Sequence, residues 1–113
     1  MRANIPWIRV EADGIHIRPA DFFVDPVQPV AHALITHGHA DHARGGHGRT
    51  FATPETLAIM QLRYAVEKGA QPFAYRQTVE LPGGVSATFL PAGHILGSAQ
   101  ILLEYAGERV VIT

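Results

Sequence analysis

The stretch that decides the fold of this chain is Thr-His-Gly-His-Ala-Asp-His at residues 36–42, directly after the apolar run Ala-Leu-Ile at residues 33–35. It carries three imidazoles and one carboxylate: His37, His39, His42 and Asp41. The apolar run indicates a buried strand, and folding alone gives no reason to crowd ionisable side chains against its end. A divalent metal ion gives one, because it binds neutral imidazole and carboxylate and offsets the cost of removing them from water.

The spacing within this stretch favours two metal ions. Alternate side chains of an extended segment point to the same side, so His37 and His39 can converge on one ion. Asp41 and His42 come where the chain turns into a loop or helix start, and they are placed to reach a second ion. Pairs of metals about 3.5–4 Å apart serve many hydrolytic enzymes. We therefore expect Asp41 and His42 to be catalytic residues as well as ligands, with a His-rich surface loop as the alternative.

A second stretch, at residues 91–100, reads Pro-Ala-Gly-His-Ile-Leu-Gly-Ser-Ala-Gln. Together the two stretches resemble motifs of the metallo-β-lactamase superfamily, and the second resembles the third motif of its β-CASP nuclease branch. Residues 21–26, 40–44 and 53–56 are most similar to the bacterial ligase-associated DNA exonucleases. The resemblance implies an α+β fold, the αββα sandwich, of which this chain supplies roughly the N-terminal half.

The resemblance also implies a ligand set. His37, His39 and His94 would hold one zinc ion, while Asp41 and His42 would begin the second site. A set of three histidines with an open position suits catalytic zinc, and manganese also suits a His and carboxylate site. The alternative for His94 alone is a structural or exposed loop histidine.

Four further residues carry expectations of their own. Asp25 matches an acidic residue that ends a strand in the family's first motif, so we expect it beneath the metal loop, fixing that loop or accepting a hydrogen bond from a ligand. A simple Asp-Pro turn is the alternative. His16 and His32 have no partner pattern and are expected on the surface, and His47 is expected in a solvated loop.

The last residues of the chain, 110–113, read as a strand. In similar proteins this strand leads into Gly-Asp, whose carboxylate bridges the two metals. We therefore expect residues 1–113 to form a partial domain that lacks this carboxylate, the later histidine ligands and the β-CASP lobe, and that leaves a sheet face exposed. A catalytically silent metal-binding fragment is one consequence.

Composition bounds the remaining possibilities. With 113 residues, 47% hydrophobic and 17% charged, the chain suits one small globular domain rather than a disordered one. It has no apolar run of the roughly 18 residues that span a membrane, and no signal-peptide core. The absence of cysteine fits a cytoplasmic protein. The formal net charge of −1 gives no basic footprint for nucleic acid, so that partner is expected from the resemblance alone.

Short strands around one helix are expected. The strands fall at residues 7–11, 15–18, 22–24, 33–36, 50–52, 77–81, 85–90, 100–105 and 109–113, with an Asp-Gly hairpin turn at residues 12–14. The helix begins with Thr53 as N-cap and Pro54 as its first residue, and ends near Gly69. Leu57, Met60 and Tyr64, with Ile59, form its core-facing stripe.

The implied function is that of a metal-dependent nuclease, a DNA exonuclease acting in repair with a DNA ligase. An RNA-processing relative is a close alternative, because the metal ligands do not distinguish the two nucleic acids. A small-molecule hydrolase of the same fold, acting on thioesters or lactams, is a more distant one.

Overall fold

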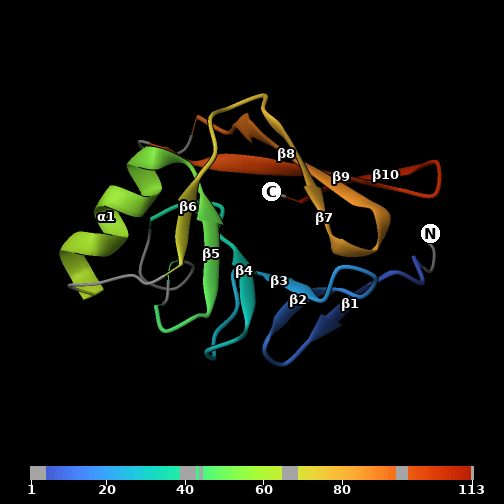
Figure 1. Cartoon of the computed structure of the whole chain (residues 1–113), viewed down its shortest axis with the longest axis horizontal. Helices are drawn as coiled ribbons and strands as arrows, with labels where there is room; N and C mark the ends of the chain where they lie inside the picture. The colour runs from blue at the N-terminus through green and yellow to red at the C-terminus, as the bar shows by residue number, and fades with distance from the viewer. Residues whose placement is uncertain (1–4, 39–42, 44, 65–68, 94–96, 113) are drawn as a thin grey trace.

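The computed structural model describes residues 5–38, 43, 45–64, 69–93 and 97–112, which form two facing β-sheets with one helix alongside (Figure 1). The first sheet holds six strands in chain order: β1 (Ile8–Glu11), β2 (Gly14–Ile17), β3 (Phe22–Val24), β4 (His32–Leu34), β5 (Arg49–Ala52) and β6 (Ala70–Pro72). The second holds four, in the spatial order β10 (Glu108–Ile112), β9 (Ala99–Tyr105), β8 (Val85–Pro91) and β7 (Thr78–Leu81). A short 3-10 helix, η1 (Pro82–Gly84), joins β7 to β8.

The first sheet combines two pairing modes. Strands β1, β2 and β3 are antiparallel, and the first pair is the predicted hairpin, with Glu11 opposite Gly14. Strands β3, β4, β5 and β6 are parallel. The carboxyl ends of these parallel strands therefore lie at one end of the sheet, which is where an open α/β-type sheet places its functional loops.

The helix α1 (Pro54–Tyr64) connects β5 to β6 and lies alongside them (Figure 1). Its start is as predicted, because the Thr53 hydroxyl accepts a hydrogen bond from the Thr56 N–H at 3.3 Å and Pro54 is the first helical residue. Met60 is fully buried and Leu57 packs against the core, whereas the side chain of Tyr64 lies outside the described residues. No helix in the described part of the chain is long and apolar enough to cross a membrane.

Both sheets contribute to one hydrophobic core. The largest fully buried apolar side chains come from strands of each sheet and from α1: Phe22, Phe89, Ile17, Leu34, Ile35, Met60, Ile101 and Leu103. The two inner sheet faces thus cover each other within these residues. The expectation of an exposed inner sheet face was wrong. The chain contributes strands to both sheets, and the inner face of each sheet is covered by the other.

Most strands differ from their predicted ranges by a single residue at one or both ends, and the larger differences are at β4 and β6. Strand β4 ends at Leu34, although the Ile35 N–H still donates to the Phe51 carbonyl at 3.0 Å, so the pairing extends a little further. Strand β6 was not predicted, because Ala70, Gln71 and Pro72 show no apolar alternation and proline is tolerated only at a sheet edge. That residues 1–113 form only part of a domain stays a prediction.

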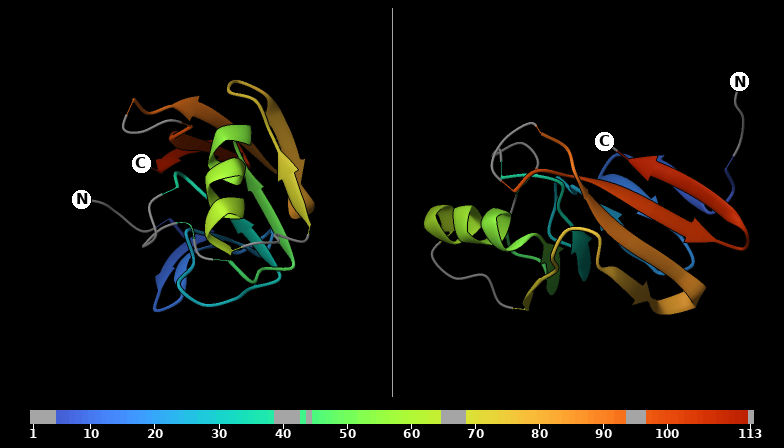
Figure 2. Two further views of the ribbon diagram at one scale, coloured as in Figure 1. Left: turned by 90° about the vertical axis from the view of Figure 1, so that its left-hand side faces the viewer. Right: turned by 90° about the horizontal axis from the view of Figure 1, so that it is seen from above.

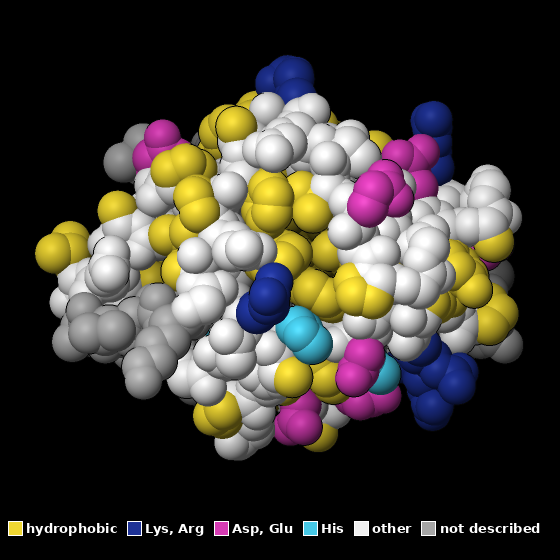
Figure 3. Space-filling view, viewed as in Figure 1, with side chains coloured by type: hydrophobic (Ala, Val, Ile, Leu, Met, Phe, Trp, Pro, Cys, Tyr) yellow, Lys and Arg dark blue, Asp and Glu magenta, His cyan; other side chains and the backbone are white. Residues whose placement is uncertain are grey.

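A groove of about 440 Å³ opens between the sheets near the starts of β4 and β5. Figure 3 shows hydrophobic side chains gathered in this hollow, and its lining includes Phe22, His32, Arg49, Phe51 and Phe73. The three phenylalanine rings follow one another, with centroids 5.2 Å and 5.0 Å apart. Its lining extends from the starts of β4 and β5 to Phe73 beyond β6, and it includes no described residue of the His-x-His stretch.

Candidate metal centre

Thr36, the first residue of the His-rich stretch, is fixed from two directions. Its N–H donates to Asp25 Oδ1 at 2.8 Å and its hydroxyl donates to Asp25 Oδ2 at 2.7 Å. Its carbonyl accepts a hydrogen bond from the Ala99 N–H at 2.6 Å. Thr36 is only 2% exposed, so these bonds are sheltered from water and worth more than they would be on the surface. The start of the metal loop therefore has a defined position.

Asp25 supplies the carboxylate that receives both Thr36 donors. It follows β3 directly, and its N–H donates to the Leu34 carbonyl at 2.9 Å, which continues the β3–β4 pairing. Its φ of 48° lies in the left-handed region, which Asp tolerates better than most residues. The partners of Asp25 are the Thr36 N–H and hydroxyl, and its role beside a metal site stays a prediction.

The next two residues lead the loop past the helix. His37 is half-buried, and Gly38 is buried against α1. A Cβ on Gly38 would lie 2.9 Å from Ile59 Cγ2 and 3.1 Å from Ile59 Cδ1, so glycine is needed for the loop to pass this close. The backbone leaving β4 is thereby held between Asp25 on one side and Ile59 on the other.

The second motif is anchored at its far end. The Ser98 carbonyl accepts hydrogen bonds from the Tyr75 hydroxyl at 2.7 Å and from the Ala92 N–H at 3.2 Å. The Gly97 carbonyl accepts from the hydroxyls of Thr53 at 2.6 Å and Thr56 at 3.0 Å. The loop between β8 and β9 is thus closed on itself and tied to the start of α1.

These contacts bring the two motifs to the same end of the sandwich. Figure 2 shows the end of β4, the start of β9 and the start of α1 converging there. The bond from Ala99 to Thr36 joins residues that flank the His-x-His stretch and the Pro-Ala-Gly-His stretch. Two positions 63 residues apart in the sequence (99 − 36) are therefore in contact here.

Four of the five predicted metal ligands lie outside the described residues: His39, Asp41, His42 and His94. Among the residues that are described, no group of three or more His, Cys, Asp or Glu is close enough to hold a metal. The ligand set and the catalytic roles of Asp41 and His42 therefore stay predictions. The residue types suit the prediction, because imidazoles with a carboxylate are suitable zinc or manganese donors.

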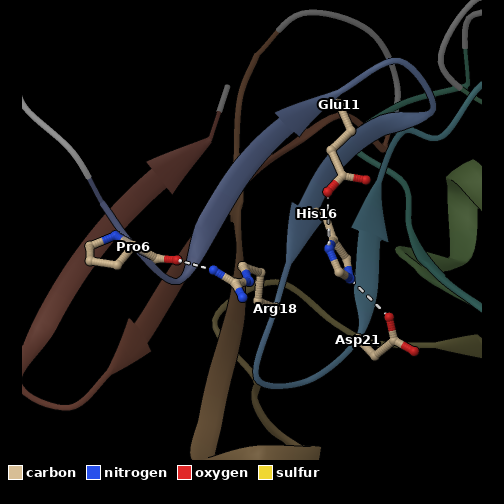
Figure 4. A network of polar contacts seen from close by, with 5 residues as sticks. All are labelled: Pro6, Glu11, His16, Arg18 and Asp21. Carbon is tan, nitrogen blue, oxygen red and sulfur yellow. Dashed lines mark hydrogen bonds and ion pairs between the residues drawn. The ribbon is translucent and has the colours of Figure 1, made fainter.

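The remaining histidines differ from their predictions. His16 has several partners: its Nε2 lies 2.8 Å from Asp21 Oδ1 and its Nδ1 lies 3.5 Å from Glu11 Oε2 (Figure 4). Its ring also stacks on that of Phe23. These contacts arise from the pairing of β1, β2 and β3, which no single segment reveals.

The other two histidines are more enclosed than expected. His47 was predicted in a solvated loop but is only 5% exposed, and its Nδ1 accepts a hydrogen bond from the Val30 N–H at 3.2 Å. His32 is half-buried against the ring of Phe22, 4.8 Å between centroids, because it begins a strand that faces the groove. Its buried Nδ1 has no hydrogen-bond partner among the described residues.

Tyr75 is a residue of this end that sequence reasoning missed. Burial raises the pKa of its phenol above the ordinary value of 10.0, and the negative charge of Glu55 raises this pKa further. The phenol therefore keeps the proton that it donates to Ser98. Thr56 was missed as well, since the stretch of residues 53–56 reads as a helix start and gives no sign of a contact with the distant Gly97.

Comparison with known proteins adds relatives in both sequence and structure. No family model matches the chain. It is 30% identical over 105 residues to a protein named "Probable DNA ligase" from Opitutus terrae, covering 93% of this chain and 10% of that protein. It is 28% identical over 114 residues to "Endoribonuclease YSH1" from Mycosarcoma maydis, covering 71% of this chain and 13% of that protein. The chain thus spans only a small part of these curated relatives.

Two solved structures share its architecture. One is a metallo-β-lactamase HARLDQ-motif mutant from Cronobacter sakazakii, with a TM-score of 0.58 and 16% identity over 92% of this chain and 53% of that one. The chain has the fold of the metallo-β-lactamase superfamily. The other is Zn²⁺-bound PqqB from Methylobacterium extorquens, with a TM-score of 0.50 and 21% identity over 74% of this chain and 32% of that one. The fold expected from the two motifs is thereby confirmed. In the described part of the chain, the first motif begins after β4 and the second begins at the end of β8 and continues into β9.

Proposed function

We propose that this protein is a metal-dependent phosphodiester hydrolase, an exonuclease that acts on DNA ends in repair together with a DNA ligase. The observation that supports the proposal is the hydrogen bond from Ala99 to Thr36, which joins the first residue of the stretch at 36–42 to the stretch at 91–100. The relative named as a DNA ligase supports the choice of DNA and of a ligase partner. The amino-acid sequences of both motifs, which resemble those of the β-CASP nucleases, support the same choice.

In this proposal the metal ligands come from the two loops. His37, His39 and His94 would hold one ion, and Asp41 and His42 would contribute to the second. When bound, such ions activate water at neutral pH and neutralise charge on a phosphate group. The residues around them supply position: Asp25 fixes the main chain at Thr36, which sets the direction in which His37 leaves the sheet.

The charge of the Asp25 carboxylate also matters for the proposed site. Its carboxylate is engaged by two donors of Thr36, so its negative charge is held close to the metal loop in partly buried surroundings. A fixed negative charge at this point favours cation binding nearby, and outer partners of this kind contribute to metal affinity. We expect Asp25 to strengthen metal binding without being a ligand.

The second candidate function is cleavage of RNA. It is favoured by the relative named as an endoribonuclease, which matches 71% of this chain. The two candidates use the same metal chemistry and differ in how the sugar 2′-hydroxyl is read. Matched RNA and DNA substrates of one sequence therefore separate them.

The test is digestion of end-labelled DNA and RNA by the intact protein loaded with Zn²⁺ or Mn²⁺. We expect stepwise release of nucleotides from DNA ends, loss of that activity in His39→Ala, and retention in His16→Ala, a histidine outside the predicted centre. Cleavage of RNA alone would select the ribonuclease. If both nucleic acids stay intact, the proposal fails. Thioester or lactam turnover would then indicate a small-molecule hydrolase, and bound metal without any turnover would indicate a silent metal-binding protein.

A further inference from the structure

A row of four rings lines the groove between the two sheets. His32, Phe22, Phe51 and Phe73 follow one another, with ring centroids 4.8 Å, 5.2 Å and 5.0 Å apart. The inner two rings, Phe22 and Phe51, are 2% and 6% exposed, whereas the outer two are half-buried and offer ring surface to the groove. The groove volume of about 440 Å³ lies within the range of roughly 300–1,000 Å³ that is usual for ligand sites. The row therefore provides an aromatic surface in a space of ligand size.

The strand pairing places polar side chains on the same face of the sheet as these rings. His32 is the register partner of Arg49, and Phe51 is the register partner of Gln71. Because alternate residues of a strand point to one face, Arg49 and Gln71 share the face of Phe51, which is directed at the other sheet. A face that served packing alone would continue with apolar residues. Packing therefore gives no reason for Arg49 and Gln71 at these two positions.

The polar side chains of the groove have no partners within the described part of the chain. Arg49 and Gln71 on one sheet and Glu80 on the other are exposed, and they make no ion pair or side-chain hydrogen bond with described residues. The buried Nδ1 of His32 has no hydrogen-bond partner there either, which costs free energy that folding alone does not recover. Figure 3 shows a histidine and a basic side chain beside the hydrophobic hollow. The groove thus combines rings with available donors and acceptors.

A nucleotide has the chemistry that this combination fits. Its base stacks on aromatic side chains whatever the sequence. The edge of the base carries donors and acceptors, which amide and carboxylate side chains such as those of Gln71 and Glu80 bind. A phosphodiester carries one negative charge, which the guanidinium of Arg49 matches in charge and geometry. An apolar peptide side chain would fill the space between the rings but would leave these polar groups without partners, so the nucleotide is the better fit.

We propose that this groove binds one unpaired nucleotide of a nucleic-acid strand, with its base against the half-buried rings of His32 and Phe73 and its phosphate at Arg49. The inference rests on the proposed function in one respect, that the protein acts on nucleic acid. The described residues that line the groove include none of the predicted metal ligands. Binding in the groove is therefore measurable apart from cleavage.

The experiment is a fluorescence anisotropy titration of the intact protein with labelled single-stranded oligo(dT) and oligo(dA), whose phosphorothioate linkages resist hydrolysis. We expect Phe73→Ala to weaken binding about 10-fold, because a stacking partner of the base is removed. The matched control is Phe23→Ala, a half-buried ring that stacks on His16 and does not line the groove; it should bind like the unmodified protein. If Phe73→Ala lacks a cooperative unfolding transition, Phe73→Leu takes its place and should show the same loss, since it keeps apolar volume without the ring.

Salt dependence tests the phosphate contact. Arg49→Gln removes one contact to a single strand, so the slope of log affinity against log salt concentration should become shallower by about 0.7. Arg49→Lys keeps the charge and should keep the slope. The matched control is Arg9→Gln at an exposed position of β1, which changes the net charge by the same amount and should leave the slope as it is.

The outcomes separate this inference from the proposed function. Unchanged binding in Phe73→Ala, or an unchanged salt slope in Arg49→Gln, would overturn the inference, and an apolar peptide segment would become the favoured occupant. Binding of thymidine monophosphate that depends on Arg49, with oligonucleotide binding indifferent to both substitutions, would equally overturn the strand site in favour of a free nucleotide. Cleavage of unmodified DNA with unchanged binding in Phe73→Ala overturns the groove alone. Groove-dependent binding without any cleavage in the presence of Zn²⁺ or Mn²⁺ overturns the proposed nuclease alone.

Discussion

The motif loops and the groove are held together by different interactions. At the motif loops, position is fixed by hydrogen bonds, from Thr36 to Asp25 and from Thr53 and Thr56 to Gly97. In the groove, the ring of Phe51 packs between the rings of Phe22 and Phe73. Burial of rings stabilises in proportion to area, whereas a hydrogen bond fixes individual atoms. The groove therefore supplies mainly stability, and the motif loops supply mainly geometry.

The largest expected effect is on the free energy of unfolding, through a substitution in the groove. Phe51→Ala removes a ring that is 6% exposed and touches two other rings, so we expect the free energy of unfolding to fall by about 3–5 kcal/mol. Zn²⁺ affinity of the folded protein should stay unchanged. Urea unfolding and a zinc titration measure the two quantities, with Leu62→Ala at an exposed position as the control. Loss of zinc affinity in folded Phe51→Ala would contradict the separation between groove packing, which supplies stability, and the motif loops, which supply geometry.

The opposite pattern is expected for Asp25→Ala. It removes the acceptor of two Thr36 donors, and we expect the unfolding free energy to fall by about 3 kcal/mol, since each bond is to a charged group. Metal affinity should fall about 10-fold to 100-fold at the same time. The matched control is Asp21→Ala, because Asp21 also has a positive φ but is exposed and faces His16. Equal effects of the two substitutions on metal affinity would contradict the special place of Asp25.

The same division explains what the sequence predicted. The buried strand before residue 36 and the helix start at Thr53 are local patterns, and the structure has both elements in place. The contacts between them are not local: Thr56 meets Gly97, Tyr75 meets Ser98, and Ala99 meets Thr36. Such pairs join segments that no periodicity relates. The environment of His47 was missed for the same reason, since its burial depends on the neighbouring chain at Val30.

An intermediate effect is expected where the metal loop passes the helix. Gly38→Ala would place its Cβ 2.9 Å from Ile59 Cγ2, and such overpacking costs about 1–2 kcal/mol. In an Ile59→Ala background the same change should cost less, because the atoms it meets have been removed. Thermal or urea unfolding of the four proteins of this cycle gives the coupling. An equal cost in both backgrounds would show that Gly38 is required for another reason, and zinc titration of Gly38→Ala would show whether the loop has moved.

The smallest expected effect is on the pH dependence of stability, and it separates the hydrogen bond from Tyr75 to Ser98 from the packing of the Tyr75 ring. The pKa of Tyr75 is raised in the folded protein, chiefly by burial and secondly by Glu55, so the folded state holds this proton more tightly than the unfolded one. The contribution to stability is therefore fully present below the unfolded pKa of 10.0 and is lost as the pH rises through the folded pKa. Tyr75→Phe cannot lose a proton, so the stability difference between it and the unmodified protein should shrink as the pH rises above 10.0, measured as urea midpoints against pH. Tyr105→Phe, at a ring that packs on Trp7 away from the loop, is the control. A difference that is constant across this pH range would mean that Tyr75 acts at the loop through its ring and not through the proton that it donates to Ser98.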